Sequence, residues 1–165
     1  MLTPPSPLAA SHALEPFDCG TPSLNDWLKR RALQNQASGA TRTFVCCEAD
    51  QVVAYYALAS SAVAVSAAPG RFRRNMPDPI PVVVLGCLAI ATSHQRRGLG
   101  RALFQDAARR VIHAADAIGI RGLLVHALSE DAKAYYLQLG LDSSALDPMT
   151  LMVTIADLRA ALPPA

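Results

Sequence analysis

Residues 81–102 read PVVVLGCLAIATSHQRRGLGRA, and this stretch decides the fold class. Its first half, 81–91, is almost entirely Val, Leu, Ile and Ala, which predicts a strand buried on both faces. Residues 95–100 (QRRGLG) then form a basic, glycine-rich turn before a helix that is expected to reach about residue 117. A buried strand, such a turn and a helix form a phosphate-binding arrangement, because amides at a helix N-terminus are unpaired and the helix dipole is positive there.

Apolar periodicity and turn residues predict the elements on either side. The expected elements are a helix over 21–38, strands over 41–48 and 51–60, a proline-rich loop over 69–81, a strand over 122–127, a helix over 130–139 and a strand over 149–155. An antiparallel front half therefore joins a β-α-β back half. This order predicts a single α/β domain over residues 1–165, built on one mixed sheet.

Composition excludes several classes of protein. The 165 residues are 52% hydrophobic and 17% charged, which excludes a disordered chain. No run of 18 apolar residues is present, so no membrane span is expected. Residues 1–20 lack the basic start of a signal peptide, so the cytoplasm is the expected compartment. The four cysteines have no zinc spacing and are expected to be small buried side chains, with no metal site.

The basic residues are unevenly distributed. Thirteen of the fifteen are arginine, since Lys29 and Lys133 are the only lysines. Arg71, Arg73 and Arg74 lie together on the proline-rich loop, where they are candidate contacts to a phosphate-bearing partner, because the arginine fork donates two hydrogen bonds at once. A high arginine content is also typical of GC-rich genomes. Composition therefore permits such a partner without requiring one.

The spacing of the glycines in the turn limits which class of phosphate ligand it fits. Residues 95–100 fit neither the Walker pattern nor G-x-G-x-x-G. They match Q/R-x-x-G-x-G/A, and the sequence here resembles the GNAT superfamily of acetyl-CoA-dependent N-acetyltransferases; an ordinary strand-to-helix turn is the alternative. The resemblance implies acetyl-CoA as co-substrate and a mixed, mostly antiparallel sheet flanked by helices, splayed where strands 81–91 and 122–127 part. The contacts that it implies for acetyl-CoA are Leu88, Ala89, Ile90, Gln95, Arg96, Arg97, Gly98, Leu99, Gly100, Arg101 and Ala102.

A second segment carries the same resemblance. Residues 132–141 read AKAYYLQLGL, which is similar to the family pattern A-x-x-[FY]-Y-x-x-x-G-[FL]. The resemblance implies that Tyr136 is the general acid for the departing CoA thiolate and that Tyr135 packs against neighbours. Taken alone, two tyrosines at this place on a short helix are more often packing residues.

A narrower resemblance covers about residues 14–160. FDCG at 17–20, LNDWL at 24–28, RTFV at 42–45, YYAL at 55–58, PDPIPV at 77–82 and LVHA at 124–127 follow in order. Together they resemble the GNAT toxins of type II toxin–antitoxin pairs. That resemblance implies acetylation of the α-amine of aminoacyl-tRNA, a block of translation, and a ribbon-helix-helix antitoxin as partner, with a homodimer left open.

Two departures from this group keep other functions open. Cys87 and Ala91 stand where the group commonly has arginine and aspartate. The alternatives are acetylation of a small amine or peptide N-terminus, or a weakened toxin that mainly binds its antitoxin. Surface or packing roles are expected for His94, His113 and His126. An α-amine that titrates near or below roughly 7.7–8.0 needs no dedicated strong base, which agrees with the absence of Glu and Asp from 81–91.

Overall fold

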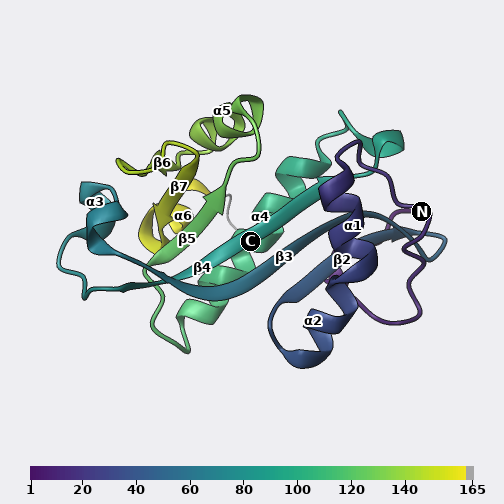
Figure 1. The fold of residues 1–165 in the computed structure, drawn as a ribbon, viewed down its shortest axis with the longest axis horizontal. Helices are drawn as coiled ribbons and strands as arrows, with labels where there is room; N and C mark the ends of the chain where they lie inside the picture. Colours follow the sequence, from purple (N-terminus) through teal and green to yellow (C-terminus); the bar gives the residue numbers. More distant parts are fainter. Residues whose placement is uncertain (163–165) are drawn as a thin grey trace. The chain divides into compact units, whose positions relative to one another are not determined.

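The computed structural model describes residues 1–162 (Figure 1). Its strands are β1 (Ser6–Pro7), β2 (Arg42–Glu48), β3 (Gln51–Val63), β4 (Ile80–Ile90), β5 (Gly122–His126), β6 (Asp142–Ser143) and β7 (Thr150–Thr154). Its helices are α1 (Pro22–Arg30), α2 (Ala32–Ser38), α3 (Gly70–Arg73), α4 (Leu99–Ala115), α5 (Glu130–Gln138) and α6 (Ile155–Ala161), with 3-10 turns η1 (Val65–Ala67) and η2 (Thr92–His94). None of the helices described is long and apolar enough to cross a membrane.

The chain forms two compact units. The first contains Met1–Ala59 and Gly86–Ala107, and the second contains Ser60–Leu85 and the chain from Ala108 onward. Strands β3 and β4 and helix α4 each contribute residues to both units.

The first unit is built on the β2–β3 hairpin. The two strands pair antiparallel from Arg42↔Leu58 to Glu48↔Gln51, and Ala49 and Asp50 make the turn with φ of 51° and 64°. Strand β1 adds to the other edge of β2. The hairpin predicted from the sequence is thus confirmed, but the predicted single helix over 21–38 is two helices, because the chain kinks at Arg31, where φ is −119°.

Two adjacent tyrosines of β3 pack against the helices on either face of this hairpin. Successive side chains of a strand point to opposite faces. Tyr55 meets α1, where its ring stacks on Trp27 at 5.9 Å and its hydroxyl donates to the Leu24 carbonyl at 2.7 Å. Tyr56 meets α4, where its hydroxyl donates to Asp106 Oδ2 at 2.5 Å. Both tyrosine side chains are fully buried.

Removing these two hydroxyls is expected to cost unequal amounts of stability. Tyr56→Phe loses a hydrogen bond to a carboxylate, worth about 1.5–3 kcal/mol, whereas Tyr55→Phe loses one to a neutral carbonyl, worth about 0.5–1.5 kcal/mol. Urea unfolding of the two variants beside the parent protein measures the difference. Equal losses of unfolding free energy would show that the Asp106 contact does not anchor α4.

The second unit contains the β-α-β part of the fold. Residues Val82–Leu85 of β4 pair in parallel with Gly122–Val125 of β5, and β5–β7 and β7–β6 pair antiparallel. Phe72 of α3 packs with Ile80, Val82, Leu124 and Met152 in the core of this unit. The strand order is β1-β2-β3-β4-β5-β7-β6, which confirms the expected mixed, mostly antiparallel sheet.

Three expectations for this unit are wrong in detail. The stretch 69–81, predicted as a loop, contains the helical turn α3. The last strand, predicted to reach 155, ends at Thr154, because the Thr154 hydroxyl accepts the Asp157 amide at 3.1 Å and caps α6 instead. The long helix, predicted to reach about residue 117, ends at Ala115.

Candidate functional site

The glycine-rich turn after β4 is fixed by side-chain hydrogen bonds. Gln95 Nε2 donates to the Ile90 carbonyl at 2.8 Å and to the Cys19 carbonyl at 2.9 Å. The Arg97 guanidinium donates to the Ser93 carbonyl at 3.1 Å. Arg96 has a φ of 64°. Gln95 thus holds the turn to the end of β4.

The start of α4 presents donors of the kind that bind an anion. The first hydrogen bond of this helix joins the Ala102 amide to the Gly98 carbonyl at 3.2 Å, so the amides of Leu99, Gly100 and Arg101 precede it. Such amides have no acceptor inside the helix and point along its positive dipole end. Gly98 has a φ of +80°, and a Cβ there would meet open space. The geometry fits a pyrophosphate, as the sequence predicts.

The second part of β4, residues 86–90, extends past the end of its ladder with β5. That ladder ends at the pair Leu85↔Val125, although β4 continues to Ile90. Of the three residues expected to contact the pantetheine arm, Ala89 is buried, and Leu88 and Ile90 are half-buried. An extended strand whose backbone groups lie beyond a ladder can pair with a linear amide-bearing ligand, in the manner of strand addition.

The two departures from the toxin group leave this strand intact. Cys87 is half-buried beside Tyr55, and burial raises the pKa of its thiol to about 11, so it carries no charge at neutral pH. Ala91 is buried, and its amide donates to the Val53 carbonyl at 2.8 Å. Strand β4 therefore continues as a regular strand to Ile90, while no charged side chain stands at these two positions.

Tyr136 lies on α5, in the second unit. The helix starts at Ser129, whose hydroxyl accepts the Ala132 amide at 3.1 Å. It ends where Gly140 adopts a φ of +96° and the Leu141 amide donates to the Tyr136 carbonyl at 3.2 Å. The Tyr136 ring is half-buried and packs edge to face on Tyr135 at 5.5 Å. Hydrogen bonds at both ends of α5 therefore hold in place the helix that carries Tyr136.

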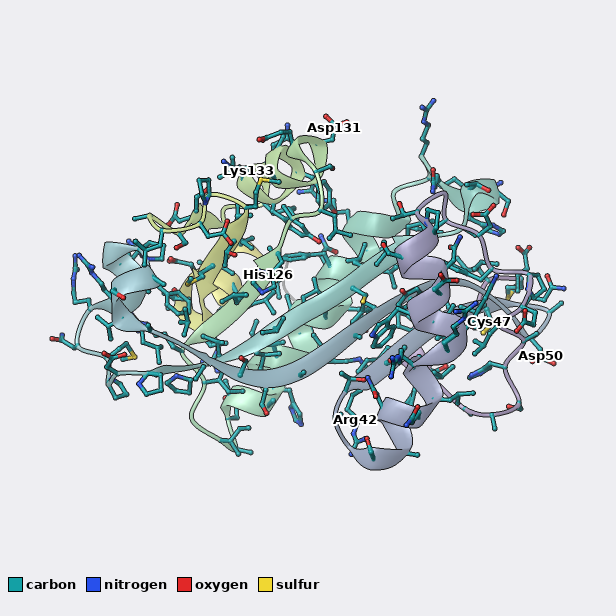
Figure 2. All side chains as sticks on the ribbon, in the orientation of Figure 1. Arg42, Cys47, Asp50, His126, Asp131 and Lys133 are labelled. Atoms are coloured by element: carbon teal, nitrogen blue, oxygen red, sulfur yellow. The ribbon has the colours of Figure 1, made fainter. Side chains whose placement is uncertain are left out.

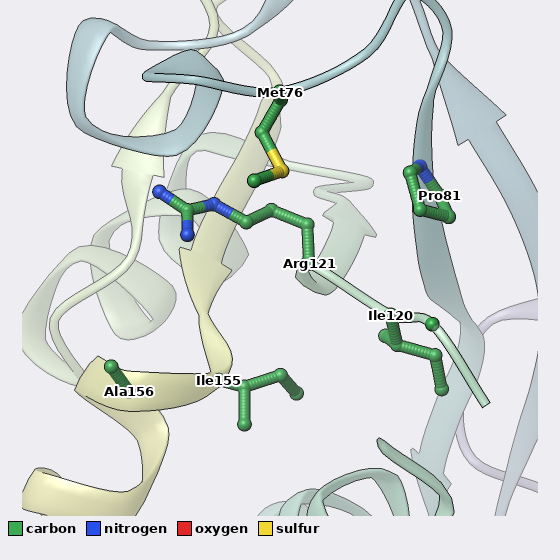
Figure 3. Close-up of a pocket in the computed structure, with 7 residues that line it drawn as sticks. Met76, Pro81, Ile120, Arg121, Ile155 and Ala156 are labelled. Atoms are coloured by element: carbon green, nitrogen blue, oxygen red, sulfur yellow. The ribbon is translucent and has the colours of Figure 1, made fainter. Parts of the chain in front are cut away.

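The arginines of the 69–81 stretch, the α3 segment, differ from one another. Arg71 forms a bidentate ion pair with Asp157 of α6, with N···O distances of 2.8 and 2.7 Å. Arg121 donates to the backbone carbonyls of Phe72 and Arg71, both at 2.8 Å. Its side chain lines a cavity of about 320 Å³ together with Met76 (Figure 3). Arg73 and Arg74 are exposed, as is Arg71. The segment is therefore anchored, and Arg71 is partly neutralised, which the sequence pattern alone did not reveal.

His94 and His126 lie in different environments. His94 Nε2 contacts Glu48 Oε2 at 2.5 Å and its Nδ1 contacts Ser93 Oγ at 2.7 Å, so it ties η2 to the end of β2. This hydrogen bond holds the pKa of the Glu48 carboxyl below its usual value. His126 instead pairs with Thr150 across β5 and β7. Within residues 1–162 no group of three or more His, Cys, Asp or Glu side chains is placed to hold a metal ion.

Known proteins match this arrangement over almost its whole length. A tRNA-acetylating toxin of Mycobacterium tuberculosis (strain ATCC 25618 / H37Rv) is 50% identical over 144 residues, 87% of each chain. The structure of AtaT complexed with acetyl-methionyl-tRNAfMet has a TM-score of 0.90 at 31% identity and covers 97% of this chain and 98% of that chain. An AtaT mutant with a tyrosine replaced by phenylalanine, bound to the C-terminus of the antitoxin AtaR and acetyl-CoA, has a TM-score of 0.83 at 30% identity and covers 97% of both chains.

The family assignment follows from the extent of these matches. The acetyltransferase (GNAT) family matches residues 11–141, which include the glycine-rich turn and Tyr136. The resemblance that the turn indicated is confirmed. This chain belongs to the acetyltransferase (GNAT) family.

Proposed function

We propose that this chain transfers the acetyl group of acetyl-CoA to the α-amine of aminoacyl-tRNA and so blocks translation as the toxin of a toxin–antitoxin pair. The observation that carries the proposal is the similarity to the M. tuberculosis tRNA-acetylating toxin at half of the aligned positions. The similarity to AtaT in complex with an acetylated aminoacyl-tRNA supports the same acceptor class.

The chemistry divides among three groups of residues. The first-turn amides of α4 and the turn 95–100 bind the pyrophosphate of acetyl-CoA, and the backbone of Leu88, Ala89 and Ile90 holds the pantetheine arm and acetyl carbonyl. The Tyr136 hydroxyl protonates the thiolate that leaves when the amine attacks the thioester. We propose that residues 1–165 form a single catalytic domain.

The proposal extends to the partners of the chain. AtaT has been solved with the C-terminus of its antitoxin AtaR. By analogy we propose that an antitoxin binds and neutralises this chain, that the antitoxin is of the ribbon-helix-helix type, and that the toxin forms a homodimer. Because the acceptor is charged tRNA, the expected compartment is the cytoplasm.

The acceptor class is tested by a competition between substrates. Acetyl-CoA and purified protein are incubated with charged tRNA, deacylated tRNA, free amino acids or short peptides, and release of the CoA thiol is followed. We expect thiol release with charged tRNA, and none above background with deacylated tRNA. Faster release with free amines or peptides than with charged tRNA would replace this acceptor by a small amine or a peptide N-terminus.

Arg73 and Arg74 of the α3 segment are expected to bind tRNA phosphates, since the charge of Arg71 is partly neutralised by Asp157. Replacing Arg73 and Arg74 together with alanine should raise the KM for charged tRNA and flatten its dependence on salt, by a log–log slope of roughly 0.7 for each phosphate that is no longer neutralised. The KM for acetyl-CoA should stay the same. A salt titration of kcat/KM measures both effects.

A matched variant removes the same charge elsewhere. Arg30→Ala with Arg109→Ala changes the net charge equally on other surfaces. An equal change of slope in both double variants would show that total charge, rather than the α3 segment, governs tRNA binding.

A further inference from the structure

A hydrogen-bonded chain of three side chains lies at the end of β5. His126 is the last residue of this strand, and its antiparallel ladder partner on β7 is Thr150 (Figure 2). The His126 Nδ1 atom lies 2.9 Å from Thr150 Oγ1. Thr150 Oγ1 donates in turn to Asp147 Oδ2 at 2.8 Å. The order of the chain is therefore imidazole, hydroxyl, carboxylate.

The turn that carries Asp147 is itself held in place. The other carboxylate oxygen of Asp147 accepts the Met149 amide at 3.1 Å. The hydroxyl of Ser144 donates to the Ala67 carbonyl and accepts the Leu146 amide at 3.2 Å. Thr150 is 7% exposed, so its hydroxyl has few competing water partners. These contacts fix the orientation of Asp147 and Thr150, and none of them involves the imidazole of His126.

The chemistry of these groups fixes the position of the imidazole proton. Hydrogen bonds from Thr150 and the Met149 amide hold the pKa of Asp147 below its ordinary value, so at neutral pH its carboxylate only accepts. The single hydroxyl proton of Thr150 is thus committed to Asp147, and its oxygen has only lone pairs to offer His126. His126 must therefore carry its proton on Nδ1, which leaves the Nε2 lone pair free to accept another proton.

His126 lies just past the β4–β5 ladder and lines a cavity of the second unit. The β4–β5 ladder ends at Leu85↔Val125, and His126 is the next residue along β5. His126 lines a cavity of about 270 Å³ whose other walls include Val63, Val84 and Leu124. Among the residues lining this cavity, only His126 and Asp147 are titratable, so no other lining group competes for the proton. His126 is also accessible to solvent, which a group that contacts substrate requires.

We propose that His126 is a catalytic base of the acetyl transfer, oriented by Thr150 and Asp147. The proposal rests on the proposed function, since its acceptor is the α-amine of aminoacyl-tRNA. As the neutral amine attacks, the N–C bond forms and the C–S bond breaks. The nitrogen passes one proton to His126 Nε2, and the CoA thiolate takes the proton of Tyr136. Exchange with water then returns a proton to Tyr136 and removes one from His126, so the net reaction converts amine and thioester to amide and thiol.

A catalytic His126 revises the expectation that this side chain packs on the surface with no part in catalysis. A moderate base suffices for an amine that is partly neutral at cellular pH, and histidine is the side chain whose ordinary pKa lies in that range. Sequence alone did not separate His126 from the other histidines, because its partners Asp147 and Thr150 lie more than twenty residues away on β7 and the turn before it.

The first test removes the imidazole. We expect His126→Ala to lower kcat for charged tRNA by about 10²-fold, at the lower end of the usual contribution of general acid–base catalysis. Added imidazole should restore part of the rate of this variant and leave the rate of Tyr136→Phe unchanged. Parent-like turnover of His126→Ala, or a fall in rate that imidazole does not restore, would overturn the proposal.

The second test changes only the orienting hydroxyl. Thr150→Val keeps the shape of the side chain and removes the hydroxyl, whereas Thr150→Ser keeps the hydroxyl. The proposal predicts a fall of about tenfold in kcat for Thr150→Val with unchanged KM for acetyl-CoA, and near-parent kcat for Thr150→Ser. Thermal unfolding of both variants provides the fold control. Equal kcat in the two variants would show that this hydrogen bond only joins β5 to β7.

The two proposals fail in different ways. If the parent protein releases no thiol with charged tRNA, the proposed function is wrong and the His126 variants are assayed on whichever amine the parent does acetylate. If the parent acetylates charged tRNA and the His126 and Thr150 variants match it, the proposed function stands and the base is not His126.

Discussion

Tyr136→Phe is expected to lower the rate of acetyl transfer by about 10²–10⁴-fold, the usual contribution of a general acid. The variant loses one hydroxyl and keeps the ring that packs on Tyr135. Without that hydroxyl the CoA thiolate departs without a proton donor, so the chemical step slows. Affinity for acetyl-CoA and the free energy of unfolding should be nearly unchanged.

Single-turnover kinetics with charged tRNA measures this effect apart from binding. Tyr135→Phe is the matched control, because it removes the neighbouring hydroxyl on the same helix and should keep most of the activity. Turnover of Tyr136→Phe at the parent rate would remove Tyr136 from the chemistry and leave it as a packing residue.

Gly98→Asp is expected to weaken binding of CoA by at least tenfold, about 1.4 kcal/mol, relative to Gly98→Asn. Position 98 has a φ of +80°, a conformation that aspartate and asparagine tolerate better than most residues. The two side chains have nearly the same shape, so the added Cβ and the backbone strain are common to both. The variants differ in one negative charge beside the amides that we propose bind the pyrophosphate.

Calorimetric titration of CoA into each variant gives the comparison. Gly119→Asp adds the same charge four residues beyond the C-terminal end of α4, where a Cβ also meets open space, and should bind CoA as the parent does. Equal affinities of Gly98→Asp and Gly98→Asn would place the pyrophosphate elsewhere.

Local patterns were sufficient to predict the middle of the fold. The strand at 81–91, the turn at 95–100 and the long helix after it are encoded by short-range signals: a run of apolar residues, glycines and a 3.6-residue period. The structure contains all three. The elements that were missed, β1, α3, β6 and α6, are short, and β1 forms only through a partner distant in the sequence, since Ser6 pairs with Val45.

The candidate site was predictable to the same degree. A turn motif and a tyrosine motif identified the family because each is contiguous in the sequence. The ion pair of Arg71 with Asp157 and the chain from His126 to Asp147 join residues that the fold brings together, and no spacing in the sequence reports such pairs. Three-dimensional contacts therefore separate Arg71 from its neighbours and His126 from the other histidines.

The product of the reaction tests the central claim most directly. Radiolabelled acetyl-CoA is incubated with the protein and total charged tRNA, the RNA is isolated, and the aminoacyl ester bond is hydrolysed in mild base. The account predicts label that travels with the RNA and is then released as N-acetyl amino acid, and none when the tRNA is deacylated beforehand. Label that stays off the RNA, or that remains on tRNA after the ester is hydrolysed, would contradict acetylation of the α-amine of aminoacyl-tRNA.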